Sequence, residues 1–423
     1  MARSGGDMTA SEQADAELGD EVRSRVMATR LDEACRSEDG RAQPCPKCGH
    51  LCRVKGSKRA RELLTLSGVH VLRRNYHYCA SCRHGWYPLD ASLGLPASGK
   101  VSREVERRLL DFGLHDTFEN AAERWSVHYN RPVSENLVRN VVERVGERLE
   151  ECNAEQLQCE LHPPSPEPAQ VLVVGVDGSM LPTRGKDPWR EAKVAAVYRT
   201  EKTTRFANGE RRQLRDARFL AVLGGKEALA HELRAALAVE RAHDASQGVW
   251  IGDGAPWIWK LAEELMPEAH QVLDWYHLSH HVHLCRKVLF GNDGITGDLW
   301  QRRAEDLVWH GEIDLLLHEL ETCLPECKPG IGHTSAIHDL IRYIETHEER
   351  LNYAVFREAG FPTGSGFIES AQRHVLQARM KRAGQHWDPT RANRMSRLRA
   401  ALRTAGPKHV HQAIYDAMNK KAA

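Results

Sequence analysis

The sequence predicts a multidomain α/β protein whose main part is built on a mixed sheet, preceded by a small cysteine-rich domain and a helical domain. Three observations support this fold class: the chain length, two C-x-x-C pairs near the N-terminus, and strand-length apolar runs that alternate with helical patterns after residue 169. The chain has 423 residues, of which 41% are hydrophobic. At about 100 to 200 residues per domain, this length predicts two to four domains. The hydrophobic share excludes a mostly disordered chain.

The charges balance overall but are unevenly distributed. The formal net charge of +1 excludes a wholly basic, histone-like protein. Between residues 41 and 90, ten Lys and Arg stand against two acids, a net charge of +8; between 371 and 410, ten stand against one, a net charge of +9. A charge run is usually a solvated helix face, but two blocks this one-sided favour a polyanionic partner, with nucleic acid as the first candidate.

Location and redox state follow from the same composition. No apolar run approaches the ~20 residues that cross a bilayer, and the acidic N-terminal segment does not fit a signal peptide. We therefore expect a cytoplasmic protein with no membrane partner. Its eleven cysteines are then expected to bind metal or remain reduced, because disulfides are rare in the cytosol.

Residues 1–40 are polar and predict a tail with at most one short helix, and residues 41–98 predict a zinc-ribbon-like domain. Its core is Cys45-Pro-Lys-Cys48 and Cys79-Ala-Ser-Cys82. Four thiolates form a closed tetrahedral site that folds a segment too small to bury its own core. Alternating residues around Ser67-Gly68 predict a hairpin that brings the two pairs together.

We expect one structural Zn²⁺ at these four cysteines. His50, Cys52 and His84 lie nearby in the sequence and are alternative ligands. The other interpretation is four unrelated buried cysteines, which the repeated C-x-x-C spacing disfavours.

Residues 99–155 have the period of three helices, interrupted near 113–117 and at Asn130-Arg-Pro132. These proportions predict a helix-turn-helix-like domain in which Ser134 caps a recognition helix. That helix would present Asn136, Arg139 and Asn140 to DNA. A packing or dimerisation module is an open alternative, because any helical hairpin has this pattern. Residues 156–168 predict a stiff linker, because four prolines fall between 163 and 168.

Residues 169–277 predict a mixed sheet with the order β-β-β-α-β-α-β. The expected strands are 171–176, 193–200, 217–224, 248–252 and 271–273, and the expected helices are 226–241 and 256–265. Residues 278–360 predict an all-α insertion, in which Ile337, Leu340, Ile341 and Ile344 share one helix face. Residues 361–405 are expected to complete the mixed-sheet domain with a final helix and a basic segment. Residues 406–423 predict a tail.

Acidic residues mark the ends of the predicted strands. Asp177 and Asp253 each follow an apolar strand and precede a glycine. Such a position suits metal binding, although Asp is also a common turn residue. Glu369, on the helix entered through Gly364-Ser-Gly366, would supply a third carboxylate. Three carboxylates can hold two Mg²⁺ ions that promote an in-line phosphoryl displacement without a protein nucleophile.

The sequence around these acids resembles the ISKra-type insertion-sequence transposases, which belong to the Mutator-like DDE enzymes. The similar stretches are Val176-Asp-Gly-Ser-Met180, 250–259, 273–277 and 363–370, together with the cysteine pairs and 87–95, so the resemblance covers roughly residues 44–405. It implies an RNase H-like catalytic fold with Asp177, Asp253 and Glu369 as the triad. It also implies that Asp274 and His277 form a D-x-x-H signature.

Asp253 and Asp274 both end strands, and the strand count assigns the second catalytic position, at the end of the fourth strand, to Asp253. We therefore expect Asp274 to support the catalytic residues without binding the metal ions itself. His277 would bind metal or phosphate, or act as a polar cap at the start of its helix. In the basic segment, Arg379, Lys381 and Arg382 are expected to contact DNA.

The resemblance implies a DNA transposase that cuts at element ends and joins the freed 3′ hydroxyl to target DNA. It would use two Mg²⁺ ions, which Mn²⁺ can replace. Its partners would be double-stranded DNA, as terminal repeats and as target, and further copies of the same chain on that DNA, at the nucleoid. Two alternatives are an RNase H-like nuclease that cuts without joining and a catalytically silent, transposase-derived DNA-binding protein.

Overall fold

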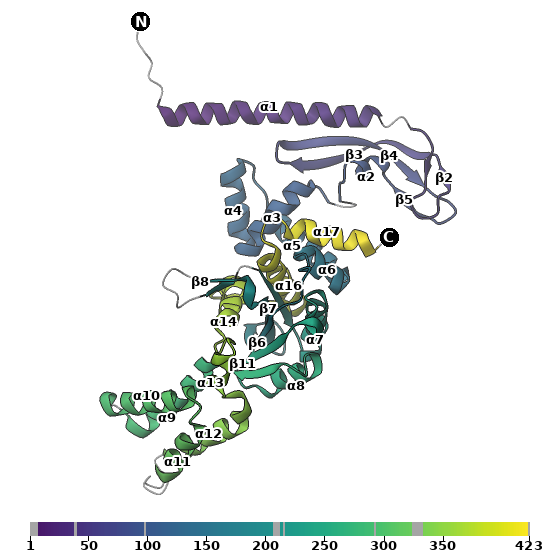
Figure 1. The fold of residues 1–423 in the computed structure, drawn as a ribbon. Helices are drawn as coiled ribbons and strands as arrows, with labels where there is room; N and C mark the ends of the chain where they lie inside the picture. Colours follow the sequence, from purple (N-terminus) through teal and green to yellow (C-terminus); the bar gives the residue numbers. More distant parts are fainter. Residues whose placement is uncertain are drawn as a thin grey trace. The chain divides into compact units, whose positions relative to one another are not determined.

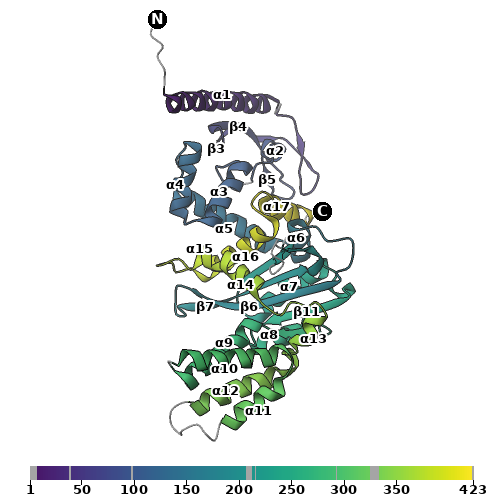
Figure 2. The ribbon, with the colours of Figure 1, turned by 60° about the vertical axis from the view of Figure 1, so that its left-hand side comes forward.

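The computed structural model describes residues 7–37, 40–96, 99–205, 212–214, 216–291, 293–323 and 333–421 (Figures 1 and 2). It comprises two compact units, Met1–Val142 and Glu143–Ala423, whose boundary falls within helix α5 (Glu135–Glu151). Among the described helices, none is long and apolar enough to cross a membrane.

The first unit begins with one long helix, α1 (Met8–Ser37), where the sequence predicts at most a short one. Most of its residues are exposed. Its Leu31 side chain is buried together with Leu72 and Leu89, and Met27 packs against this cluster. The side chains that α1 buries contact residues later in the sequence. The sequence of α1 itself has no continuous apolar stripe, so its full length was not predicted.

A long antiparallel hairpin follows, as predicted. Strands β3 (Val54–Thr65) and β4 (Gly68–Tyr78) pair up to Thr65 opposite Gly68. The turn is Leu66-Ser67, one residue earlier than predicted, because Gly68 already belongs to β4 with a φ of 126° that favours glycine. Shorter elements complete this region: β1 (Gln43–Pro44), β2 (Leu51–Cys52), β5 (Gly85–Trp86) and α2 (Pro88–Ser92).

The three predicted helices of the next segment are present as α3 (Arg103–His115), α4 (Phe118–Tyr129) and α5. Helix α4 ends at Asn130, which adopts the left-handed conformation with a φ of 48°. Ser134 Oγ then accepts a hydrogen bond from Leu137 N at 3.2 Å, as a residue that caps the start of α5 does. Asn130 and Ser134 therefore account for the short connection between α4 and α5.

The second unit is built on a five-stranded mixed sheet with the order β10-β7-β6-β11-β12. The strands are β6 (Val171–Pro182), β7 (Trp189–Arg199), β10 (Ala217–Leu223), β11 (Gln247–Gly252) and β12 (His270–Leu273). β7 pairs antiparallel with both β6 and β10, whereas β11 pairs in parallel with both β6 and β12. The mixed sheet predicted from the sequence is confirmed.

Helices cover this sheet, which explains the continuous apolar runs of its strands. Helices α7 (Lys226–Val239) and α16 (Pro389–Ala405) pack against β10, and α14 (Gly366–Gln372) packs against β6 and β7. Two further helices are α6 (Ala154–Leu161) and α8 (Pro256–Leu265), and a small hairpin is formed by β8 (Thr203–Arg205) and β9 (Arg212–Leu214).

Between β12 and α14 the described residues are mostly helical, as predicted. The helices are α9 (Trp275–Phe290), α10 (Gly294–Trp309), α11 (Ile313–Cys323), α12 (His333–His347) and α13 (Tyr353–Glu358), and α9 to α12 lie side by side in both views (Figures 1 and 2). The four residues predicted to share a face of α12, from Ile337 to Ile344, are all buried.

The C-terminal part is more ordered than the sequence predicts. Helix α17 (Val410–Lys421) occupies the segment expected to be a tail. Its Val410, Ile414 and Ala417 side chains are buried, and the helix packs against α6. The apolar side chains of α17 thus find their partners about 250 residues earlier in the sequence.

Candidate functional site

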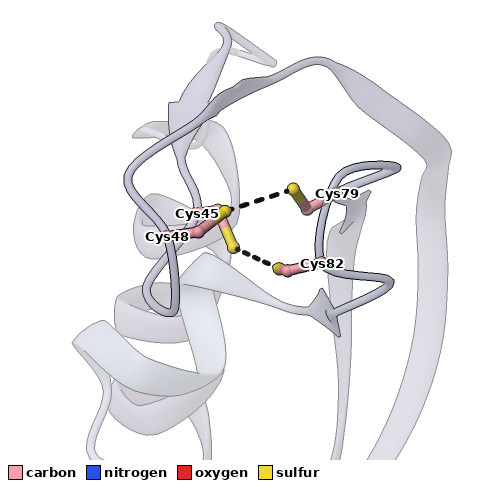
Figure 3. A group of neighbouring side chains, drawn as sticks. All are labelled: Cys45, Cys48, Cys79 and Cys82. Carbon is pink, nitrogen blue, oxygen red and sulfur yellow. Dashed lines mark hydrogen bonds between the residues drawn. The ribbon is translucent and has the colours of Figure 1, made fainter.

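Four cysteines converge in the first unit (Figure 3). Cys45 Sγ lies 3.5 Å from Cys82 Sγ, and Cys48 Sγ lies 3.5 Å from Cys79 Sγ. All four sulfur atoms lie within 4.8 Å of one another. The cluster is therefore placed to bind a metal such as zinc, which prefers four thiolates in a closed tetrahedral site.

The two cysteine pairs sit in similar tight turns. Cys45 N donates to His50 O at 2.9 Å, and Cys79 N donates to His84 O at 2.8 Å. A hydrogen bond from the Cys82 backbone N–H is the largest cause that lowers the pKa of Cys79 to about 6. The lowered pKa favours the thiolate, which is the form in which a cysteine binds metal. The alternative ligands His50, Cys52 and His84 lie outside the group of four.

The purified protein is expected to contain about one Zn²⁺ per chain, measured by elemental analysis. Cys48→Ser should lose most of this metal, because three thiolates leave the tetrahedral site open. Cys159→Ser, which changes a cysteine of the second unit, should keep it. Undamaged wild-type protein without zinc would contradict the assignment.

The predicted catalytic acids meet at one edge of the sheet in the second unit. Asp253 directly follows β11, as predicted. Asp177, in contrast, does not end its strand: it lies inside β6, paired with Val194 of β7. On its other side β6 pairs with β11 only as far as Gly175. Asp177 therefore stands just beyond the end of the parallel pairing, which is also where Asp253 follows β11.

Helix α14 brings Glu369 to this edge through a close contact with the sheet. A Cβ atom at Gly175 would overlap the ring of Phe367. The Phe367 ring also packs edge-on against Tyr198, with centroids 4.9 Å apart. The missing side chain at Gly175 thus lets α14 approach β6, two residues before Asp177.

The pKa values at this site reflect burial and the charges of neighbouring acids. Burial, followed by the charge of Asp253, raises the pKa of Asp177 to about 6. The hydrogen bond to Asp274 is the largest cause that raises the pKa of His277, and the charges of Asp253 and Asp177 add to it. The negative charges of Asp177, Asp253 and Asp274 therefore act on one another and on His277, an arrangement that suits a cation.

A cavity of about 640 Å³ opens at this site. Asp177 and Glu369 both line it, together with Gln372, Arg373 and His374. Among the residues that the structure describes, the acids do not form a group as tightly clustered as the four cysteines. The cavity leaves open space beside Asp177 and Glu369, and Asp253 is not among its lining residues.

Gln372 and Lys381 also belong to this site, and a role for Gln372 was not predicted from the sequence. Gln372 Nε2 donates to Asp177 Oδ2, and to Gly178 O at 3.0 Å. Lys381 Nζ donates to Ser179 Oγ at 2.6 Å. Gln372 lies three residues after Glu369, and this spacing on one helix face is the signal that would have indicated it.

Asp274 has a different environment from the other acids. It is fully buried, and Oδ2 accepts hydrogen bonds from His277 N at 3.2 Å and from His277 Nδ1 at 2.8 Å. Oδ1 accepts one from Ser365 N at 2.6 Å. Both oxygens thus hold the start of α9 and the loop that leads to Glu369.

A π-helical segment, Arg373–Gln377, follows α14 directly. The wider hydrogen-bonding period of a π-helix leaves backbone carbonyls to be satisfied by other groups. Arg399 of α16 is buried, and its guanidinium donates to the carbonyls of His374 and Val375. Arg399 therefore stabilises the turn that places Gln372 beside Asp177.

The residues predicted to read DNA from α5 differ in exposure. Asn136 and Asn140 are exposed on the helix surface. Arg139 is half-buried, and its guanidinium donates to Asn136 Oδ1 at 2.7 Å and to Glu135 Oε1 at 3.1 Å. These contacts hold Arg139 against its own helix.

The basic segment of the second unit is less available than its net charge suggests. Arg379 is only 1% exposed, so the prediction that it contacts DNA is wrong for this conformation. Its guanidinium lies 5.1 Å from the ring centroid of Trp387. Arg382 is half-buried and donates to Ala378 O at 3.2 Å. Arg394 forms ion pairs with Glu143, Glu147 and Glu150.

Comparison with known proteins places the chain in a family. No curated protein matches the sequence. Among solved structures, the chain is similar to the Drosophila P element transposase strand transfer complex, with 12% sequence identity, a TM-score of 0.33, and coverage of 73% of this chain and 93% of that chain. Residues 53–412 match an uncharacterised protein family, UPF0236. Because this match spans most of the sequence, the chain belongs to the uncharacterised protein family UPF0236.

Proposed function

We propose that this protein is a DDE-type DNA transposase that cuts DNA at the ends of a mobile element and joins the 3′ hydroxyl to target DNA. The observation that carries the proposal is the gathering of acids at one sheet edge. Asp177 and Glu369 line one cavity, and Asp253 raises the pKa of Asp177. Such a set of carboxylates is what metal-assisted phosphoryl transfer requires.

The strand arrangement supports an RNase H-like catalytic core within this proposal. Three antiparallel strands come first, and two parallel strands extend the sheet from β6. The first acid lies on the first strand and the second acid follows the fourth strand. This is the placement expected from the ISKra-type resemblance of the sequence, and the helices α9 to α13 correspond to its insertion.

Asp177, Asp253 and Glu369 would hold Mg²⁺. When bound, the metal would activate the attacking oxygen and stabilise the leaving oxygen of a phosphodiester. The chain itself orients these ligands. Gln372 fixes one oxygen of Asp177 and leaves the carboxylate in one orientation. Lys381, which lies beside Ser179, would contact a phosphate of the DNA.

The remaining parts would bind and position the DNA. We assign residues 41–98 to a zinc-ribbon-like domain and 99–155 to a helix-turn-helix-like domain. The linker predicted at 156–168 begins only after α6, because that helix occupies Ala154–Leu161. Asn136 and Asn140 are exposed on α5, which supports their contact with DNA. Arg382 is half-buried and would contact DNA through its accessible atoms. Joining two element ends would require more than one copy of the chain.

The test is an assay with full-length protein and linear DNA that carries the sequences bordering its own gene. With Mg²⁺ or Mn²⁺ we expect cleavage at the element ends and joined products, both absent without divalent metal. Ca²⁺ should permit binding with little catalysis, because its longer and looser coordination misplaces the reacting oxygens. Cleavage without joined products would indicate a nuclease instead. Binding without cleavage in any metal would indicate a DNA-binding protein.

A further inference from the structure

A second hollow adjoins the candidate active site. It is a groove of about 740 Å³, larger than the 640 Å³ cavity that contains Asp177 and Glu369. Gly366 and Ser370 line both. A polymer held at the carboxylates could therefore continue into the groove without leaving the protein surface.

The groove combines aromatic rings with positive charge. Five aromatic side chains and two arginines line it: Tyr198, Phe219, Tyr276, Phe361, Phe367, Arg357 and Arg403. Among the described residues that line it, none is Asp or Glu. A positively charged channel with aromatic faces is the combination that binds single-stranded nucleic acid.

Tyr276 is the best placed of these rings. It is 60% exposed, although it lies between the buried Asp274 and the half-buried His277. A Cβ atom at Gly364 would lie 3.2 Å from Tyr276 Cε2, so the ring rests against the loop that leads to Glu369. An exposed, fixed aromatic ring next to the catalytic acids offers a surface on which a base can stack.

Arg403 supplies a free positive charge within the groove. The Arg403 side chain is exposed, and its guanidinium lies 5.4 Å from the Phe219 ring centroid. No carboxylate of the described chain pairs with it. Arg357 is held in place differently: it lies 4.2 Å from the Trp309 ring centroid and donates to Trp309 O at 3.1 Å.

We propose that this groove holds a single-stranded DNA segment next to the phosphate that is cut. One base stacks on Tyr276, and Arg403 contacts a phosphate. The inference rests on the proposed function, since it extends the DNA away from the same carboxylates. The occupant is single-stranded because the base faces of a duplex are covered by their neighbours, so a protein ring stacks only on bases released from the helix.

The test measures DNA binding by the full-length protein in Ca²⁺, using fluorescence anisotropy. One probe is a labelled duplex with a single-stranded thymidine extension of about ten nucleotides, a length within the usual range of single-strand sites. The other is the same duplex with blunt ends. Wild type should bind the extended probe more tightly, because only that probe can enter the groove.

Two variants test the residues. Tyr276→Ala should weaken binding of the extended probe about tenfold and leave blunt-end binding unchanged, whereas Tyr276→Phe should bind like wild type. Arg403→Ala should lower the log–log salt slope for the extended probe by about one. Arg302→Ala is the matched control, because Arg302 is exposed on α10 and lines neither hollow.

A photocrosslink gives a second readout that does not depend on affinity. An extension that carries 5-iododeoxyuridine should crosslink to Tyr276, as mapped by mass spectrometry. Equal binding of both probes by wild type, or unchanged binding by Tyr276→Ala with no crosslink at Tyr276, would overturn the inference alone if the protein still cuts and joins DNA ends. Failure to bind either probe would overturn the proposed function, and the inference with it.

Discussion

Asp177→Asn, Asp253→Asn and Glu369→Gln are each expected to lower DNA cleavage and joining by about a thousandfold or more, with DNA binding nearly unchanged. Each substitution removes one charge from the set that would hold Mg²⁺. Losing several kcal/mol of transition-state stabilisation slows the reaction by this factor, because each ~1.4 kcal/mol corresponds to a tenfold change in rate. Glu264→Gln, an exposed acid on α8, is the matched control and should remain active.

Asp177→Asn should lose activity without losing stability. Burial and the charge of Asp253 raise the pKa of Asp177 to about 6, above its ordinary value of 3.8. The folded protein therefore holds this proton more tightly than the unfolded chain. The resulting stabilisation is complete below pH ~3.8 and is lost as the pH rises through ~6. At pH 8 the metal-free variant, which is always neutral at this position, should melt at the same temperature as wild type or higher.

The same ionisation sets the pH dependence of activity. A protonated carboxyl does not bind metal, so cleavage at low Mg²⁺ concentration should fall as the pH drops through about 6.

An Asp253→Asn protein that still joins DNA ends would show that the second carboxylate has been wrongly chosen. Asp274 would then be the residue to consider in its place.

Asp274→Ala is expected to destabilise the protein by roughly 3 to 5 kcal/mol, measured by urea unfolding. The Asp274 carboxylate is fully buried and accepts bonds from His277 N, His277 Nδ1 and Ser365 N. Its removal leaves buried donors without an acceptor, and it also removes the cap of α9. Activity should also fall, because Ser365, in the loop before Glu369, loses its hydrogen bond to Asp274.

Asp388→Ala is the matched control for this effect. Asp388 caps α16 in the same way, accepting from Arg391 N at 3.1 Å, but it is exposed. Its loss should cost only about 1 kcal/mol, the usual value for a helix cap. If Asp274→Ala unfolded at the same urea concentration as wild type yet had no activity, Asp274 would act in the chemistry rather than in the fold.

The net charge of the basic segment, residues 371–410, overstates the positive surface that this segment presents. Ten cations between residues 371 and 410 predict a binding surface, yet several of them are used internally. Arg397 pairs with Glu232 at 2.6 Å, and Arg394 pairs with acids of α5. Those acids are more than 150 residues away in the sequence, so no local count of charge can reveal the pairing. Arg373 and Arg403 remain exposed beside the acids and the groove.

Features that depend on residues close together in the sequence could be predicted before the structure was known. The cysteine spacing predicted the four-cysteine cluster, the alternating residues predicted the β3–β4 hairpin, and the apolar runs predicted the mixed sheet. Each of these patterns is repeated over a few residues, and its period is imposed by backbone geometry.

Contacts between side chains that lie far apart in the sequence could be seen in the folded chain alone. The sequence predicted Asp177 at a strand end, but β7 continues to pair with β6 past that residue, so the edge is defined by where β11 stops. The contact of Gln372 with Asp177 and the ring of Phe367 over Gly175 join segments almost 200 residues apart. Such contacts depend on the packing of α14 against the sheet, and packing is a property of surfaces that local sequence does not bring together.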